Sequence, residues 1–177
     1  MSRGEFFGFA LLAIVVGLLV VSSRSGNGRA ELVSKGMPLP PLMVEGWLNV
    51  EGGKLTRESL NGKVVVIDCW ATWCPPCRAA MPELAKLYAK YQPLGVEFLG
   101  LTSETERDRA AIENFIASVD GFDWPVGYGA LPMQDQLGIQ VLPTVIVFDQ
   151  EGSVVWSGSQ LFGFEAAIEQ ALAKAEG

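Results

Sequence analysis

The amino-acid sequence predicts an α/β fold, with a central mixed β-sheet flanked by helices and one N-terminal transmembrane helix. From residue 64 onward, short apolar runs typical of strands alternate with segments of helical periodicity, which is the pattern of an α/β sheet. Before that, an apolar run without charged residues extends from Phe6 to Ser23. The chain has 177 residues, 49% of them hydrophobic, which suits one compact domain and a short additional segment.

The N-terminal run is long enough to cross a bilayer, because its 18 residues would form a helix of roughly 27 Å. We therefore interpret residues 1–23 as a membrane anchor or uncleaved signal, with residues 6–23 in the lipid bilayer, and residues 24–36 as a flexible tether. A cleaved signal peptide is the alternative, although the small-residue sites at 21–23 and 28–30 match its cleavage pattern poorly. Arginines flank the run on both sides, so charge does not decide its orientation.

The folded domain is assigned to residues 37–177, with its start expected between residues 32 and 38. Its first strand is predicted at 64–67, where a β-branched run has the composition of a strand buried on both faces. A helix is predicted after the cysteines that follow, because apolar residues recur there at helical spacing and prolines are tolerated in a first helical turn. The apolar positions of this helix are Leu84, Leu87, Tyr88 and Tyr91.

A second strand is predicted at 96–101, and a second helix after it. Ser103 and Glu106 have the spacing of a capping box, which marks the start of that helix. The positions expected to face inward are Ile112, Phe115, Ile116 and Val119.

The C-terminal third is predicted to contain a hairpin and a closing helix. Two apolar runs at 144–148 and 154–156 are separated by residues with turn composition, and residues 164–175 have the pattern of an amphipathic helix. The stretch 120–133 is rich in glycine, proline and aromatic residues. We interpret it as a packed loop rather than as a platform for substrate.

Composition narrows the possible functions. The formal net charge is -7, and residues 1–30 carry three arginines and one glutamate, so the negative charge lies in the rest of the chain. An acidic surface repels phosphate backbones, and we expect no nucleic acid partner. The absence of histidine from the sequence excludes a Ser-His or Cys-His pair and a histidine-bound metal, so the chemistry must come from thiols and carboxylates.

Two of the three cysteines stand in Trp73-Cys74-Pro75-Pro76-Cys77, where the first strand gives way to a helix. Unpaired N–H groups and the helix dipole lower the pKa of a thiol at a helix start, so we interpret Cys74 as the nucleophile. One helical turn brings Cys77 beside it, and Cys77 is predicted to resolve a mixed disulfide. No cofactor is predicted beyond a redox-active disulfide between Cys74 and Cys77.

Other uses of the cysteines are less well supported. Structural zinc takes four ligands, which three cysteines without a histidine do not provide, so no metal site is predicted. A disulfide that closes so short a loop would stabilise the fold little. Cys69 alternates to the face of its strand opposite Asp68, and we interpret it as an inert core residue rather than a redox partner.

Asp68 is a carboxylate at the end of a strongly apolar strand. Burial there would raise its pKa, and it would then accept a proton from Cys77 as that thiol attacks. A solvated strand end, or a carboxylate that accepts hydrogen bonds, is the alternative. We favour the catalytic role because Asp68 stands six residues before Cys74.

Residues 66–78, Val-Ile-Asp-Cys-Trp-Ala-Thr-Trp-Cys-Pro-Pro-Cys-Arg, resemble the active-site segment of the TlpA/ResA-like thiol:disulfide oxidoreductases, a membrane-anchored branch of the thioredoxin superfamily. The resemblance covers roughly residues 36–175. Ala80 stands where relatives usually carry glutamate, which leaves the tuning of the potential and the choice of partner open. Cys69 stands where relatives usually carry phenylalanine, and a redox-sensitive thiol there is an alternative that we do not favour. Other landmarks of that family match Gly62-Lys63, Pro82-Glu83-Leu84, Trp124-Pro125 and Val141-Leu142-Pro143-Thr144.

The resemblance implies a thioredoxin-like fold and reduction of disulfides in cysteine-containing exported proteins, apocytochromes c awaiting haem attachment among them. It implies that a cis peptide bond precedes Pro143, which faces the dithiol, and that substrate chains bind at Trp73, Pro75, Pro76, Leu142 and Pro143. It also implies a membrane electron donor and a single-pass cell-membrane protein whose domain lies on the extracytoplasmic, periplasmic side.

Two other functions are weighed against this one. A membrane-displayed thioredoxin-fold binding module would use the surface around Pro143 and keep its disulfide idle. A thiol peroxidase would place a lone peroxidatic cysteine after a strand, whereas this chain has Trp-Cys-x-x-Cys. Asp68 matches the buried acid of thioredoxin itself, whereas membrane-tethered relatives more often have asparagine there, and this match supports the proton-transfer role.

Overall fold

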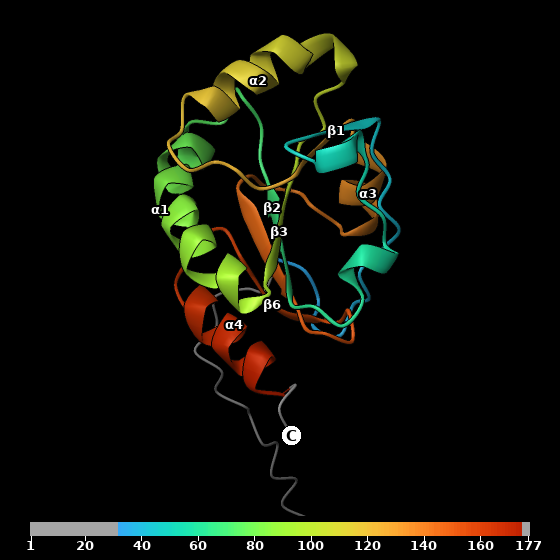
Figure 1. The fold of residues 1–177 in the computed structure, drawn as a ribbon, viewed down its shortest axis with the longest axis vertical. Coiled ribbons are helices and arrows are strands. Elements are labelled where there is room, and N and C mark those ends of the chain that lie inside the picture. Colours follow the sequence, from blue (N-terminus) through green and yellow to red (C-terminus); the bar gives the residue numbers. More distant parts are fainter. Residues whose placement is uncertain (1–31, 175–177) are drawn as a thin grey trace, which may run out of the picture.

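The computed structural model describes residues 32–174, which form a six-stranded mixed sheet covered by helices on both faces (Figure 1). This confirms the predicted α/β architecture. The strand order is β1-β4-β3-β2-β5-β6. The strands are β1 (Gly46–Leu48), β2 (Val65–Cys69), β3 (Glu97–Leu101), β4 (Val126–Tyr128), β5 (Thr144–Phe148) and β6 (Val154–Gly158). The helices are α1 (Pro75–Tyr91), α2 (Arg109–Ala117), α3 (Leu131–Gln136) and α4 (Phe164–Ala173).

Strand β2 lies in the middle of the sheet because all five of its residues are apolar or buried, so both of its faces need cover. It pairs in parallel with β3 and antiparallel with β5. In this register Asp68 stands between Gly100 on β3 and Val145 on β5. The strand predicted from the β-branched run is therefore confirmed, and it extends to Cys69.

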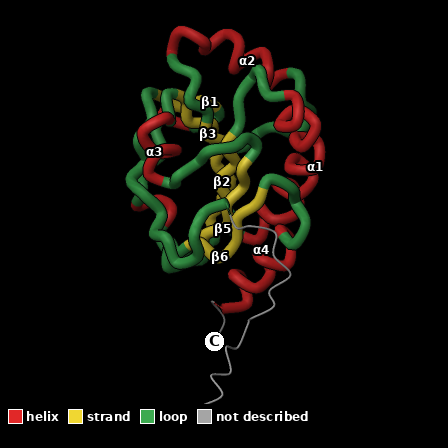
Figure 2. Tube along the Cα trace, turned by 180° about the vertical axis from the view of Figure 1, so that it is seen from behind, coloured by secondary structure: helices red, strands yellow, loops and turns green. Residues whose placement is uncertain are grey.

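The two faces of the sheet are covered by different elements. Helices α1 and α4 lie on one side and α3 on the other, which the view from behind also shows (Figure 2). Side chains of β2 alternate between them: Val66 belongs to the cluster under α1, α2 and α4, whereas Ile67 and Cys69 belong to the cluster on the α3 side. We call these the α1 face and the α3 face of the sheet.

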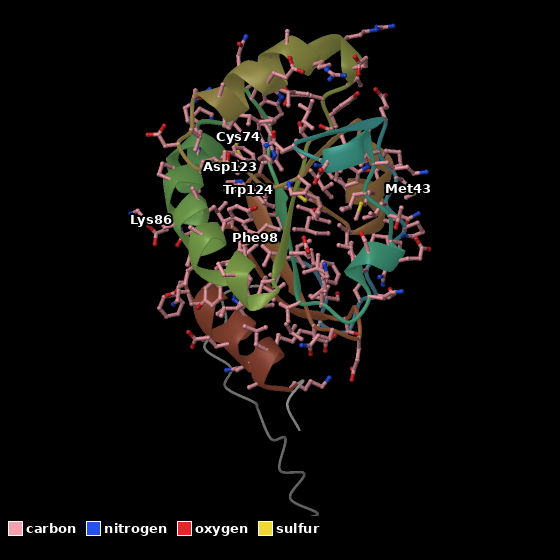
Figure 3. All side chains as sticks on the ribbon, in the orientation of Figure 1. Met43, Cys74, Lys86, Phe98, Asp123 and Trp124 are labelled. Carbon is pink, nitrogen blue, oxygen red and sulfur yellow. A yellow bond between two sulfur atoms is a disulfide. The ribbon has the colours of Figure 1, made fainter. Side chains whose placement is uncertain are left out.

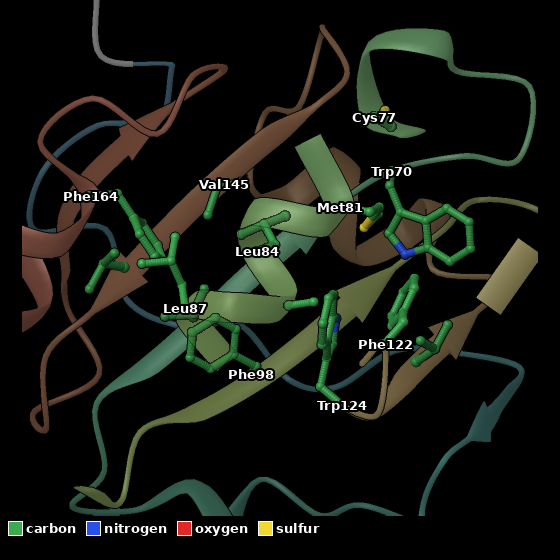
Figure 4. Close-up of a cluster of buried hydrophobic side chains, with 14 of the residues drawn as sticks. Trp70, Cys77, Met81, Leu84, Leu87, Phe98, Phe122, Trp124, Val145 and Phe164 are labelled. Atoms are coloured by element: carbon green, nitrogen blue, oxygen red, sulfur yellow. The ribbon is translucent and has the colours of Figure 1, made fainter. Parts of the chain in front are cut away.

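The core of the α1 face is aromatic (Figure 4). Trp70 stacks on Phe115 with ring centroids 4.5 Å apart, and Phe122 stacks on Trp124 at 4.1 Å. The apolar positions predicted for the two helices contribute to this cluster. The core therefore fixes α1, and with it the residues at the start of that helix, against β2.

The chain before β1 runs along the outer edge of β6. Val33 is 2% exposed, and its N–H donates to Ser157 Oγ at 2.9 Å. Further along, the Gly36 N–H donates to the Val154 carbonyl at 2.8 Å and the Val154 N–H donates to Met37 at 2.9 Å. Residues 33–37 therefore pair with the edge of β6 and pack on the domain, within the range of 32–38 where its start was expected.

Two local predictions were wrong. The capping box is formed by Thr105 and Asp108, whose carboxylate accepts the Thr105 N–H at 3.0 Å, two residues after the predicted Ser103 and Glu106. The stretch 120–133 is not a loop, since it contains β4 and the start of α3. A three-residue strand with a central glycine is too short to show the alternation of a strand.

Within residues 32–174, no helix is both long and apolar enough to span a membrane. The predicted anchor at residues 1–23 lies outside this part of the chain.

Candidate redox site

The first half of the site is the passage from β2 to α1. A turn closes there through a hydrogen bond from the Cys74 N–H to the Ala71 carbonyl, 3.2 Å long. The turn leaves Trp73 projecting into solvent with 69% of its surface exposed, whereas Cys74 is 3% exposed. Figure 3 shows Cys74 at the start of α1, on the side of the sheet that holds Phe98 and Trp124.

Cys74 is the N-cap residue of α1, and Pro75 and Pro76 occupy the first two helical positions. Prolines have no N–H, so the first N–H of the helix belongs to Cys77. That N–H donates to Cys74 Sγ at 3.2 Å. The prolines thus leave the cysteine sulfur as the acceptor for the first helix N–H, where partial positive charge favours a thiolate.

Cys74 and Cys77 form a disulfide, with Cα atoms 5.3 Å apart. Cys77 is fully buried and packs in the cluster of the α1 face, whereas Cys74 keeps a small exposed fraction of 3%. The two sulfurs therefore differ in access, with Cys74 the outer and Cys77 the inner one. This is the arrangement that the predicted roles of nucleophile and resolving thiol require.

By the alternation of β2, the Asp68 side chain lies on the α1 face, and the residue is 1% exposed. Desolvation by burial raises its pKa from 3.8 to about 7. Within residues 32–174, neither carboxylate oxygen has a hydrogen-bond partner, so the alternative of a carboxylate satisfied by donors does not hold. Nor is the residue a solvated strand end. A carboxyl group with a pKa near 7 exchanges protons readily at neutral pH.

Gly100 leaves space beside Asp68 on the neighbouring strand. A Cβ atom at Gly100 would lie 3.0 Å from Trp70 Nε1 and 3.3 Å from Trp124 Nε1. Both indole nitrogens are buried without a partner among the described residues. The glycine thus lets two tryptophans close over the strand next to the carboxyl group, which keeps that group out of water.

Cys69 is fully buried on the α3 face and is a free thiol. Burial, and to a smaller extent the charge of Asp68, raises its pKa well above that of an ordinary thiol. It is therefore a protonated thiol in an apolar cluster, as expected for an inert core residue.

The second half of the site comes from the start of β5. The resemblance implied a cis peptide bond before Pro143, and the Leu142-Pro143 bond is cis. Thr144, the first residue of β5, pairs with Cys69, so Pro143 directly precedes β5 at the end of the sheet where β2 ends and the Cys74 turn starts. Leu142 is half-buried and packs against the cluster that contains both cysteines. The exposed Trp73, Pro75 and Pro76 lie at the same end of the domain, while their role in binding substrate stays a prediction.

Two residues at this site were not singled out from the sequence. Glu104, after β3, accepts hydrogen bonds from the Thr72 N–H at 2.8 Å and from the Thr72 hydroxyl. The two residues are 32 positions apart and belong to no motif, so only the fold reveals the contact.

In this domain a central strand leads through a tight turn into a helix that begins at a Cys-x-x-Cys pair. The sheet is mixed and has helices on both faces. Together these two features define the class of thioredoxin-fold dithiol proteins. The chain belongs to the Redoxin family, whose model matches residues 35–171.

Named relatives agree with the branch indicated by the active-site segment. "Thiol-disulfide oxidoreductase ResA" of Bacillus thuringiensis (strain Al Hakam) is 36% identical over 108 residues, which cover 60% of this chain and 61% of the relative. The ResA protein of Bacillus cereus (strain ATCC 10987 / NRS 248) is 31% identical over 162 residues, covering 82% of this chain and 85% of the relative. These findings support a ResA/TlpA-like member of the thioredoxin superfamily.

Solved structures show the same fold. A candidate thiol:disulfide interchange protein DsbE from Chlorobium tepidum superposes with a TM-score of 0.64 at 26% identity, covering 82% of this chain and 99% of the other. The thioredoxin-like fold is thereby confirmed for the domain. The alignment with the B. thuringiensis relative spans only about three fifths of its length, so its activity is transferred below as a proposal.

Proposed function

We propose that this chain is a thiol:disulfide oxidoreductase that reduces disulfides in exported proteins through Cys74 and Cys77. One observation carries the proposal: the first available N–H of α1 is directed at the sulfur of Cys74, the outer of the two cysteines. A thiolate on Cys74 would gain that hydrogen bond and the positive end of the helix dipole.

The reaction begins with both cysteines reduced. The Cys74 thiolate attacks one sulfur of a substrate disulfide, a mixed disulfide forms, and the other substrate sulfur leaves as a thiolate. Cys77 then loses its proton and attacks Cys74 Sγ, which releases the second substrate thiol and forms the Cys74–Cys77 disulfide. Two electrons have passed to the substrate, and a membrane electron donor would return two electrons to the cysteines.

Asp68 is proposed to accept the proton of Cys77. Its pKa of about 7 means that ionised and protonated forms coexist at neutral pH, so the group can take up a proton and give it back later. Its side chain lies on the α1 face, the face whose cluster includes Cys77. The indole rings of Trp70 and Trp124, which lie next to Gly100, would keep bulk water from exchanging protons with Asp68 during this transfer.

A membrane location is proposed from residues 6–23, with the domain on the extracytoplasmic side. Leu32 lines a small pocket together with Val141 and Thr144, so the chain enters the domain beside the loop that contains Pro143. Residues 24–31 would span at most about 30 Å even if fully extended. The dithiol end of the domain would therefore stay close to the bilayer, within reach of a membrane-embedded electron donor.

The substrate class is proposed by analogy with the ResA proteins as cysteine-containing exported chains, including apocytochromes c. The exposed Trp73 beside a nearly buried Cys74 suits a polypeptide rather than a small oxidant, because an aromatic surface next to the sulfur offers area to a bound chain.

Insulin reduction tests this function. The wild-type chain should reduce insulin with dithiothreitol as electron source, and Cys74→Ala should not. A wild-type rate no higher than that of Cys74→Ala would refute the enzyme and leave a thioredoxin-fold binding module. Consumption of hydrogen peroxide without insulin reduction would indicate a thiol peroxidase instead. A redox titration of the Cys74/Cys77 couple then gives the direction, because a low potential favours reduction of substrates.

A further inference from the structure

The Glu104 side chain contacts the turn that contains Cys74 from outside that turn. Thr72 lies inside the turn that the Cys74 N–H closes with the Ala71 carbonyl. The Thr72 N–H donates to Glu104 Oε2 at 2.8 Å. The Thr72 hydroxyl donates to the second oxygen, Glu104 Oε1. Glu104 thus grips Thr72 with both carboxylate oxygens, two residues before the nucleophile.

Glu104 is itself fixed from two directions. The hydroxyl of Thr102, which is fully buried at the end of β3, donates to Glu104 Oε2 at 2.8 Å. The Gly129 N–H, after β4, donates to the Glu104 carbonyl at 2.6 Å. The Thr102 carbonyl in turn accepts the Ala130 N–H at 2.9 Å. The carboxylate therefore ties the Cys74 turn to the ends of two other strands.

We propose that Glu104 is a positioning residue for the redox reaction, which holds the Ala71–Cys74 turn so that Cys74 Sγ meets the first N–H of α1. Without Glu104, the Thr72 N–H and hydroxyl would lose their acceptors among the described residues, and the turn would be held only by its own weak hydrogen bond. The role rests on the proposed function, since it concerns the reactivity of Cys74.

The need is for hydrogen-bond acceptance at fixed positions rather than for charge. A glutamine at position 104 can direct its oxygen to the Thr72 N–H and the Thr102 hydroxyl, while its amide donates to the Thr72 hydroxyl, which accepts as well as donates. Glu104→Gln should therefore keep the hydrogen bonds to Thr72 and the reactivity of Cys74, whereas Glu104→Ala should lose both. If the negative charge were what mattered, both substitutions would act alike.

The experiment compares Glu104→Ala, Glu104→Gln and Glu113→Ala. Glu113→Ala is the matched control, because Glu113 lies on the exposed face of α2 and, among the described residues, forms its ion pair with Arg109. Two quantities are measured at a temperature where all variants are folded: kcat/KM for insulin reduction, and the pH profile of iodoacetamide alkylation of Cys74 in the reduced protein. We expect Glu104→Ala to lower kcat/KM about tenfold and to move the alkylation midpoint to higher pH, because a misplaced sulfur loses its helix N–H. Glu104→Gln and Glu113→Ala should stay within about twofold of wild type.

Thr72 provides an independent second pair in case Glu104→Ala does not fold. Thr72→Ser keeps the hydroxyl and Thr72→Val removes it, while Glu104 keeps its contacts with Thr102 in both. Thr72→Val should show a smaller loss of the same kind and Thr72→Ser none. An unchanged alkylation profile in Glu104→Ala, or equal losses in Glu104→Ala and Glu104→Gln, would overturn the proposal. A wild-type chain that reduces no insulin would overturn the proposed function instead, and the alkylation profiles would still report on the turn.

Discussion

Cys69 and Cys74 lie five residues apart and both are nearly or fully buried, but the fold gives the two sulfurs different surroundings. Cys69 points to the α3 face, among aliphatic side chains, and burial raises its pKa well above the ordinary value. Cys74 sits at a helix start, where the Cys77 N–H donates to its sulfur. If Cys74 is the proposed nucleophile, the reactivity of a thiol in this chain is set by the backbone groups that face it and not by burial alone.

Removal of each sulfur in turn tests whether Cys74 and Cys69 differ in their contribution to activity. Cys74→Ala should lower the rate of insulin reduction by at least about a thousandfold, because the nucleophile is lost. Cys69→Ala should leave the rate within about twofold. Both rates are measured with the same insulin turbidity assay. A large loss of activity in Cys69→Ala, with its thermal stability preserved, would show that Cys69 takes part in catalysis.

Asp68→Asn should change how stability depends on pH. The folded-state pKa of about 7 lies above the ordinary value of 3.8, so the folded state binds a proton that the unfolded state has released. The contribution of Asp68 to stability is thus fully present below about pH 4 and is lost as the pH rises through 7. Asp68→Asn should therefore be more stable than wild type by up to about 4 kcal/mol at pH 8, and nearly equal to it at pH 4. Urea unfolding at both pH values measures this, and an equal difference at the two would contradict the raised pKa.

Cys69→Ser tests whether the surroundings of Cys69 on the α3 face are apolar. A hydroxyl group in that apolar cluster would lack a partner, so the free energy of unfolding should fall by about 2 kcal/mol, against about 1 kcal/mol for Cys69→Ala. Chemical denaturation of the reduced proteins distinguishes the two. Equal stability of the serine and alanine variants would mean that the site offers a hydrogen-bond partner to the hydroxyl.

Trp73→Ala is expected to have the smallest effect. Because Trp73 is exposed beside Cys74, its loss should raise KM for insulin about fivefold, close to 1 kcal/mol, and leave kcat and stability nearly unchanged. Leu94→Ala is the matched control, since Leu94 is an exposed apolar residue that follows the other end of α1. An equal change in both variants would argue against a substrate contact at Trp73.

The strongest sequence signals were those with a dense local pattern. The β-branched run before Asp68 predicted β2, and Cys74 and Cys77 with their prolines predicted both the helix start and the redox chemistry. These features depend on neighbours in the chain, so their physical causes are visible in the sequence.

The features of the fold and of the site that the sequence did not predict depend on contacts between distant segments. β1 and β4 have three residues each and exist because they pair with each other, which no local pattern reveals. The role of Gly100 follows from two tryptophans that the fold brings together, and the contact between Glu104 and Thr72 follows from the way three strand ends meet. Tertiary packing, rather than intrinsic propensity, decided these parts.

The segment that runs beside β6 has a consequence for how this protein can meet other chains. With residues 33–39 hydrogen-bonded along β6 and only three residues in β1, the domain offers little free backbone at either side for an incoming strand to extend the sheet. Partners would have to bind to the loops around Cys74 and Cys77. Association of two copies through their sheet edges would be disfavoured. Deleting the residues up to 36 should expose that flank and make the truncated protein prone to aggregate.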